Sequence, residues 1–274
     1  MNRILILHLP TLFLLSLASS QVVHAVLVFD NGGPNTVDTL VTDFIEVYDS
    51  LGGDVTTVTF DTGAIITGTH PSDDTVAAFD RSVVNILDGI FSNDVTGYDE
   101  STINVYGGSL IDDLFGLQSA TINVFGGTVV EDVTVLDDAT AYLTGGVFNE
   151  DIEVDGGLID ISGGMLAANG LGGLDIGLGA DADGTIILRG SSFTVNGVPA
   201  TSGPIADISG TISGTLADGS TFTDVPFDRD PSGGPDTGNI IIAIPEPSPF
   251  VAWCLCGLLF TGIKRRNSRC LAAI

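Results

Sequence analysis

Acidic residues recur at a fixed interval in the middle of this chain. Asp94, Asp113, Asp132 and Asp151 follow one another every 19 residues, each preceded by Asn93, Asp112, Glu131 or Glu150. Carboxylates stacked about 5 Å apart repel by roughly 1 kcal/mol per pair in water, and calcium, which takes six to eight oxygen ligands, relieves such repulsion. The four aspartates are therefore candidate calcium ligands; the alternative is a solvated acidic corner that keeps the surface soluble. No other cofactor is expected.

The same interval runs through the residues around these acids. The segments 84–95, 103–114, 122–133 and 141–152 align without a gap, and a fifth copy, 160–166, arrives one residue early. A short fixed period is typical of a solenoid, in which each coil buries its apolar side against its neighbours. Within each copy apolar and polar residues alternate and β-branched residues dominate, so the coils are predicted to consist of strands.

Three apolar positions in each copy predict three short strands per coil. One column contains Ile86, Val105, Val124 and Leu143, the second Phe91, Leu110, Val129 and Phe148, and the third Val95, Leu114, Val133 and Ile152. Glycine pairs at 107–108, 126–127, 145–146 and 163–164 fall between the first two columns, where the coil must bend sharply. We expect an all-β fold, a single-stranded parallel β-helix of about 19 residues per coil, right-handed as parallel crossovers usually are.

The net negative charge of the chain limits the classes of molecule that can bind it. The 274 residues carry a net charge of −27, and the body between about 26 and 246 contains three arginines, no lysine and all 35 acids, which gives −32. Such a surface repels phosphate backbones, so no nucleic-acid partner is expected. Soluble cations and neutral molecules are the partners that this charge favours.

The N-terminus has the pattern of a signal peptide. A charged start that ends at Arg3 is followed by the apolar run 4–20 and by the small-residue site Val23-His24-Ala25. We expect signal peptidase to cleave after Ala25, which makes 1–25 a signal peptide and the body an exported protein.

The C-terminus contains three parts in order. Pro245-Glu246-Pro247 is followed by an apolar run from Phe250 to Ile263, expected to be a hydrophobic helix, and then by Lys264-Arg265-Arg266. Basic residues after an apolar segment hold that end in the cytoplasm, and about fourteen apolar residues are short for a stable span. The segment 244–274 is thus predicted to be a transient inner-membrane anchor, with a plain tail anchor as the alternative.

This order of parts resembles the PEP-CTERM sorting signal of Gram-negative bacteria. The resemblance implies processing by an exosortase-type membrane protease, in bacteria that make exopolysaccharide or biofilm, and delivery of the body to the cell surface or extracellular matrix. The body also resembles the β-strand-rich repeat proteins that precede this signal in planctomycetes and proteobacteria, on the copies INVYGG (103–108) and INVFGG (122–127) and on the segment 212–220. We expect an N-terminal β cap at 26–80, and coils with closing strands at 81–243.

Catalytic groups are scarce in the expected body. His70 is its only histidine, no G-x-S-x-G elbow is present, and Cys254, Cys256 and Cys270 all lie in the tail. We therefore expect a structural or adhesive surface protein and not an enzyme. Two alternatives stay open: a polysaccharide-acting β-helix protein of the pectate-lyase type, with Arg189 as proton acceptor, and a carbohydrate- or calcium-binding module that uses Tyr106 and Phe125, with extracellular polysaccharide as partner.

Overall fold

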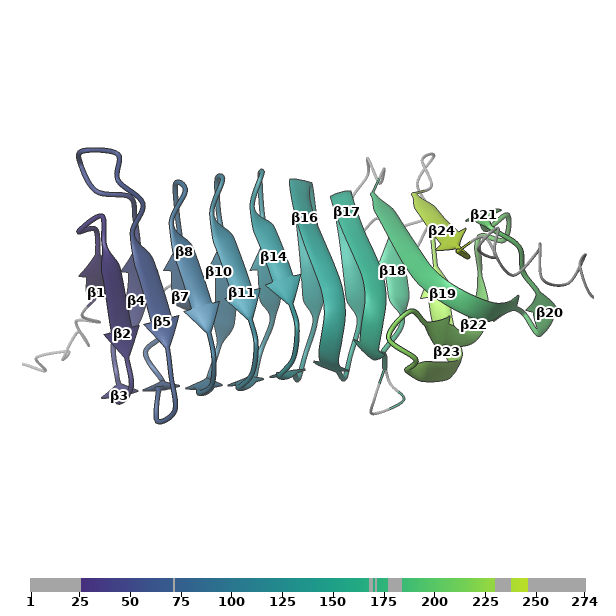
Figure 1. The fold of residues 1–274 in the computed structure, drawn as a ribbon, viewed down its shortest axis with the longest axis horizontal. Helices are drawn as coiled ribbons and strands as arrows, with labels where there is room; N and C mark the ends of the chain where they lie inside the picture. The colour runs from purple at the N-terminus through teal and green to yellow at the C-terminus, as the bar shows by residue number, and fades with distance from the viewer. Residues whose placement is uncertain are drawn as a thin grey trace, which may run out of the picture.

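The computed structural model describes residues 26–70, 72–167, 170, 172–176, 184–229 and 238–245. Within these residues every regular element is a β-strand, and the strands stack side by side into an elongated body with β1 at one end and β20 and β24 at the other (Figure 1). The prediction of an all-β repeat fold is confirmed. The expected cleavage site at Ala25, the tail helix and the sorting residues Glu246, Pro247, Lys264, Arg265 and Arg266 lie outside the described residues; Pro245 is inside them and exposed.

Each central coil contributes one strand to each of three faces, which we name A, B and C. Face A contains β8 (Val83–Ile86), β11 (Thr102–Val105) and β14 (Thr121–Val124); face B contains β9 (Ile90–Phe91), β12 (Ser109–Leu110) and β15 (Thr128–Val129); face C contains β7 (Asp74–Ala78), β10 (Asp94–Gly97) and β13 (Leu114–Gly116). The next two coils are single bent strands, β16 (Val133–Phe148) and β17 (Ile152–Met165).

Equivalent residues of successive coils pair in parallel at the predicted interval. On face A, Ile86 pairs with Val105, Val105 with Val124, and Val124 with Leu143. All twelve residues of the three predicted columns are at most 1% exposed. The predicted strand phase is therefore confirmed, and the core is a set of aliphatic and aromatic columns along the axis of the stack.

The glycine pairs between faces A and B are required for two different reasons. A Cβ on Gly126 would lie 2.6 Å from the carbonyl oxygen of Tyr106 in the preceding coil, so the first glycine permits close stacking. Gly127 has φ of +86°, which L-residues adopt only at a cost. The same combination recurs at 107–108, 145–146 and 163–164.

The N-terminal segment expected as a cap joins the same parallel ladder. The first coil consists of β1 (Val26–Phe29), β2 (Pro34–Val37) and β3 (Leu40–Val41), and the second of β4 (Phe44–Val47), β5 (Thr57–Phe60) and β6 (Ile65–Ile66). Each strand of the second coil pairs in parallel with the first coil on one side and with β7, β8 or β9 on the other. The second coil is longer than the later ones because its connections are longer.

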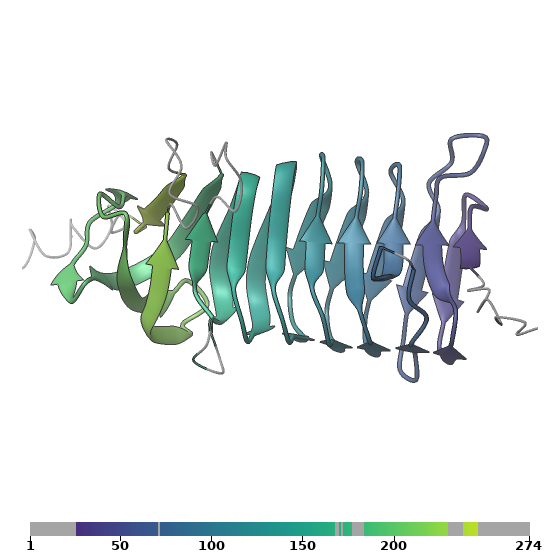
Figure 2. The same ribbon diagram turned by 180° about the vertical axis from the view of Figure 1, so that it is seen from behind.

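The C-terminal end changes to antiparallel pairing (Figure 2). Two parallel strands continue the stack, β18 (Leu174–Ile176) and β19 (Thr185–Val195). The far part of β19 pairs in antiparallel fashion with β20 (Val198–Pro199) and β22 (Ser209–Leu216), and β22 with β23 (Thr221–Asp228). β23 also pairs in parallel with β18, and β24 (Asn239–Ala243) pairs in parallel with β19. β21 (Gly203–Pro204) is antiparallel to β24. In the described part of the chain, no helix is long and apolar enough to cross a membrane.

Candidate functional site

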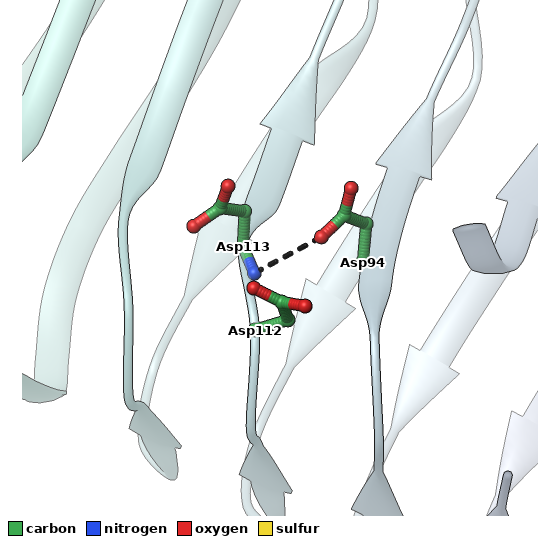
Figure 3. A group of neighbouring side chains, drawn as sticks. All are labelled: Asp94, Asp112 and Asp113. Carbon is green, nitrogen blue, oxygen red and sulfur yellow. Dashed lines mark hydrogen bonds between the residues drawn. The ribbon is translucent and has the colours of Figure 1, made fainter. Parts of the chain in front are cut away.

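The four candidate aspartates lie at the corner between faces B and C, which we call the acidic corner. Asp94 is the first residue of β10, and Asp113, Asp132 and Asp151 immediately precede β13, β16 and β17. Figure 3 shows Asp94 and Asp113 side by side on neighbouring coils, with their carboxylates pointing the same way. The predicted stacking of these residues is therefore present in the structure.

Each carboxylate of the acidic corner accepts a hydrogen bond from the backbone of the next coil. Oδ1 of Asp94 accepts the N–H of Asp113 at 3.3 Å (Figure 3), and Oδ1 of Asp113 accepts the N–H of Asp132 at 2.8 Å. The series continues from Asp132 to the N–H of Asp151 at 2.8 Å and from Asp151 to the N–H of Gly173 at 2.6 Å. The side chain thus supplies an acceptor that the sharply turning backbone does not.

The backbone carbonyls of the same residues bond in the opposite direction. The carbonyl oxygen of Asp113 accepts the N–H of Val95 at 3.0 Å, and that of Asp132 accepts the N–H of Leu114 at 2.9 Å. Asp113, Asp132 and Asp151 are therefore each held on both the N–H and the C=O by the preceding coil. This arrangement gives the carboxylates a structural role that does not depend on a metal.

The corner also brings carboxylates together in two separate groups. Oxygens of Asp94, Asp112 and Asp113 lie within 4.8 Å of one another, and so do oxygens of Asp132, Asp151 and Glu153. Such oxygen-only groups suit hard cations such as calcium. The sequence reasoning missed Glu153. Residues two apart in an extended chain have side chains on the same side, so the spacing of Asp151 and Glu153 could have indicated that Glu153 belongs to this group.

Several carboxyl groups at and beside the acidic corner have raised pKa values, which favours their neutral, protonated form. Burial, reinforced by the charges of Asp112 and Asp113, raises the pKa of Asp94 to about 7, against the lowering effect of the Asp113 N–H. Burial also raises the pKa of Asp113 and of Asp132. On the adjoining part of face C, burial and nearby aspartates raise the pKa of Glu153 to about 7 and that of Asp175 to about 6. The corner therefore favours bound protons or, by the same electrostatics, bound cations.

A second ladder of polar side chains lies at the corner between faces C and A. Asp80, Asp99, Gln118 and Asp137 all have φ between 56° and 58°. The backbone N–H of Asp80 donates to Asp99 at 3.2 Å, that of Asp99 to Gln118 at 2.6 Å, and that of Gln118 to Asp137 at 3.1 Å. The sequence reasoning missed this ladder, although its members are also 19 residues apart. Its role is again to satisfy backbone groups where the coil turns.

Face A carries the features that suggested carbohydrate binding. The amide of Asn104 donates to Asn85, and that of Asn123 to Asn104, both at 2.9 Å. The rings of Tyr106 and Phe125 are stacked, with centroids 4.8 Å apart and planes 13° apart. One face of each ring thus packs between coils, while the two side chains remain 49% and 48% exposed.

Arg189 and His70, the two catalytic candidates from the sequence, both contact other side chains of the body. Arg189 lies on β19 and binds both carboxylate oxygens of Asp160, with Nε at 2.7 and 2.9 Å and Nη2 at 2.6 Å. His70 Nδ1 lies 2.5 Å from Ser72 Oγ, and this hydroxyl donates to Asp74 at 2.6 Å. The serine stands between the histidine and the aspartate, whereas a catalytic triad has the histidine in the middle.

The comparisons with known proteins do not assign the chain to a family. No family model, no curated protein and no solved structure matches it.

Proposed function

We propose that the chain is an exported structural or adhesive protein of the cell surface or extracellular matrix, with no catalytic site. In this proposal the body is a right-handed parallel β-helix, and the C-terminal segment 244–274 is a PEP-CTERM-type signal that anchors the chain in the inner membrane until an exosortase-type protease removes it. Signal peptidase acts first, after Ala25.

The observation that carries the proposal is the continuity of side-chain ladders along the stack. Carboxylates of the acidic corner, the asparagines of face A and the second polar ladder each bond coil to coil at the same 19-residue interval. The polar groups that repeat in the sequence therefore serve to hold a long body together. A stiff, acidic body of this kind is suited to spacing and display at a surface.

Mass spectrometry of the protein recovered from its own host tests the sorting part of the proposal. We expect mature chains that begin at Val26 and lack 249–274, in the surface or matrix fraction. Chains that keep 249–274 in the surface fraction would contradict processing and favour a plain tail anchor. Turnover of a polysaccharide by the purified body would contradict the structural role.

Calcium binding at the acidic corner is the second candidate function, because the corner gathers three carboxylate groups within 4.8 Å at two places. Millimolar calcium should then raise the melting temperature more than sodium does at equal ionic strength, since a ligand that binds only the folded state stabilises it by mass action. Asp132→Asn keeps an acceptor oxygen for the N–H of Asp151 but removes the charge, so it should abolish the calcium-specific part that comes from the group of Asp132, Asp151 and Glu153. Equal effects of the two salts on the unchanged protein would end the calcium hypothesis.

A further inference from the structure

The first coil presents an open sheet edge on all three faces. Within the described residues β1 pairs only with β4, β2 only with β5, and β3 only with β6. In Figure 1 this edge forms the β1 end of the stack. Unpaired strand edges are templates for pairing with another strand.

The hydrogen bonds of the first coil show which backbone groups face outward. The carbonyl oxygens of Phe29, Val37 and Val41 accept N–H groups of the second coil at 2.9 to 3.0 Å. In a parallel strand the neighbouring residue directs its N–H and C=O to the opposite side. The backbones of Val28 and Leu40 therefore face away from the stack, as does that of Thr36.

Apolar side chains surround this edge. Val26, Leu27 and Val28 are 43%, 37% and 41% exposed, and Leu40 is 59% exposed. Two of their counterparts in the second coil are buried: Val26 pairs with Phe44, which is 7% exposed, and Leu27 with Ile45, which is 0% exposed. The first coil thus ends in apolar residues that a further coil would cover.

The opposite end of the stack does not offer a matching edge. There the parallel ladder ends with β23, which pairs with β18, and with β24, which pairs with β19. The outer sides of β23 and β24 pair in antiparallel fashion with β22 and β21. A head-to-tail contact would therefore bring a parallel edge against antiparallel strands. The surface that fits the first coil is the first coil of another molecule.

We propose that the first coil is a docking surface for the first coil of a second copy, which produces a two-fold, head-to-head dimer. A two-fold axis reverses the strand direction, so β1 pairs in antiparallel fashion with β1 of the partner. With the axis near Leu27, the N–H and C=O of Val28 meet those of Val26 in the other copy. Such an isologous contact closes on itself and forms a pair, not a filament.

Polar residues keep the contact small. Asn35 occupies an inward position of the first coil, opposite Val58, and exchanges hydrogen bonds with Asn31 at 2.8 and 3.0 Å. Pro34 removes one donor from the edge of β2. The interface therefore belongs to the small, weak class, and the acidic bodies repel each other, so added salt should strengthen the dimer.

Sedimentation of the exported chain over a range of concentrations tests the proposal. The mass should rise from monomer to dimer between low micromolar and millimolar protein, more readily with added sodium chloride. Val28→Pro blocks the edge and removes an N–H that the coil does not use, and Leu40→Lys places charge at the contact; each should weaken dimerisation at least tenfold. Ile111→Lys, at an exposed apolar position in the middle of the stack, is the matched control and should leave it unchanged.

Cross-linking identifies the geometry. With Cys254, Cys256 and Cys270 replaced by serine, Leu27→Cys, which faces its own copy across the two-fold axis, should form a disulfide between two copies on oxidation, whereas Ile111→Cys should not. Circular dichroism checks that each variant is folded. A monomer at every concentration, dimers that persist unchanged in Val28→Pro, or equal cross-linking through both cysteines would overturn the proposal without affecting the proposed surface function.

Discussion

Replacing Glu153 with glutamine should stabilise the folded chain near neutral pH. Its carboxylate lies with those of Asp132 and Asp151 at the acidic corner and accepts a hydrogen bond from the hydroxyl of Thr134 at 3.2 Å. Glutamine keeps an acceptor oxygen for Thr134 and removes the charge. The substitution therefore imitates the protonated glutamic acid, which is the form that the folded state prefers.

The magnitude follows from the pKa. A rise in the pKa of Glu153 from its ordinary 4.5 to about 7 corresponds to an upper limit of about 3 kcal/mol. Because the side chain is partly exposed, solvent screening reduces the expected gain to about 1 kcal/mol. A carboxyl whose pKa is raised on folding contributes its full stability below its unfolded pKa, and this contribution is lost as the pH rises through the folded pKa. The unchanged protein should therefore lose stability between about pH 4.5 and 7.

Urea unfolding followed by circular dichroism, repeated from acidic to mildly alkaline pH, measures this effect. Glu153→Gln should match the unchanged protein at about pH 4 and exceed it by about 1 kcal/mol above pH 7. Glu100→Gln, at an exposed position of another corner, is the control and should change stability by less than about 0.5 kcal/mol. If stability instead rises steadily with pH, and Glu153→Gln is neutral or destabilising above pH 7, burial does not control this carboxylate.

Three further substitutions test the packing of the stack, each by its unfolding midpoint. Val124→Asp should cost more than about 3 kcal/mol because it buries an unpaired charge, while Asn123→Ala should cost about 1 kcal/mol because only a half-buried amide contact is lost; equal costs would place the strand phase off by one residue. Gly127→Ala should cost about 1 to 3 kcal/mol more than Gly197→Ala, since both have positive φ but only the first is crowded by the preceding coil; equal losses would contradict this explanation. Arg189→Ala should cost about 1 to 3 kcal/mol by leaving its aspartate buried and unpaired, and an unchanged midpoint would argue against the ion pair.

The central coils were predictable because the period is visible in the residues themselves. Where successive coils have equal length, many paired positions share a residue type, as Ile103 and Ile122 do, and the alternation fixes which side is buried. The first two coils lack this signal, since Val26 pairs with Phe44 at an interval of 18 while Leu40 pairs with Ile65 at 25. Unequal connections hide a repeat even when the pairing continues through it.

The candidate site was predictable in position but not in bonding. The spacing placed Asp113 and Asp132 on neighbouring coils, because side chains at equal positions of a stack must meet. It did not predict that the carboxylate of one would accept the N–H of the other, since this depends on the backbone direction at the corner. Gln118 hid the second ladder, because it interrupts a series of aspartates with a different residue type that performs the same hydrogen bonding.

The first coils of the stack show that the turn at the acidic corner does not need a charged hydrogen-bond acceptor. In the coil before Asp94, the hydroxyl of Thr75 accepts the backbone N–H of Asn93 at 2.9 Å, so a neutral acceptor is sufficient for the turn. If the corner required only acceptors, threonine or asparagine would serve on every coil without the repulsion and burial that raise the pKa of Asp113 and Asp132. The fold therefore does not require the negative charges of these carboxylates. Their mutual repulsion is relieved when protons or cations bind to them. The stiffness of the stack should accordingly depend on the pH and the ions around it.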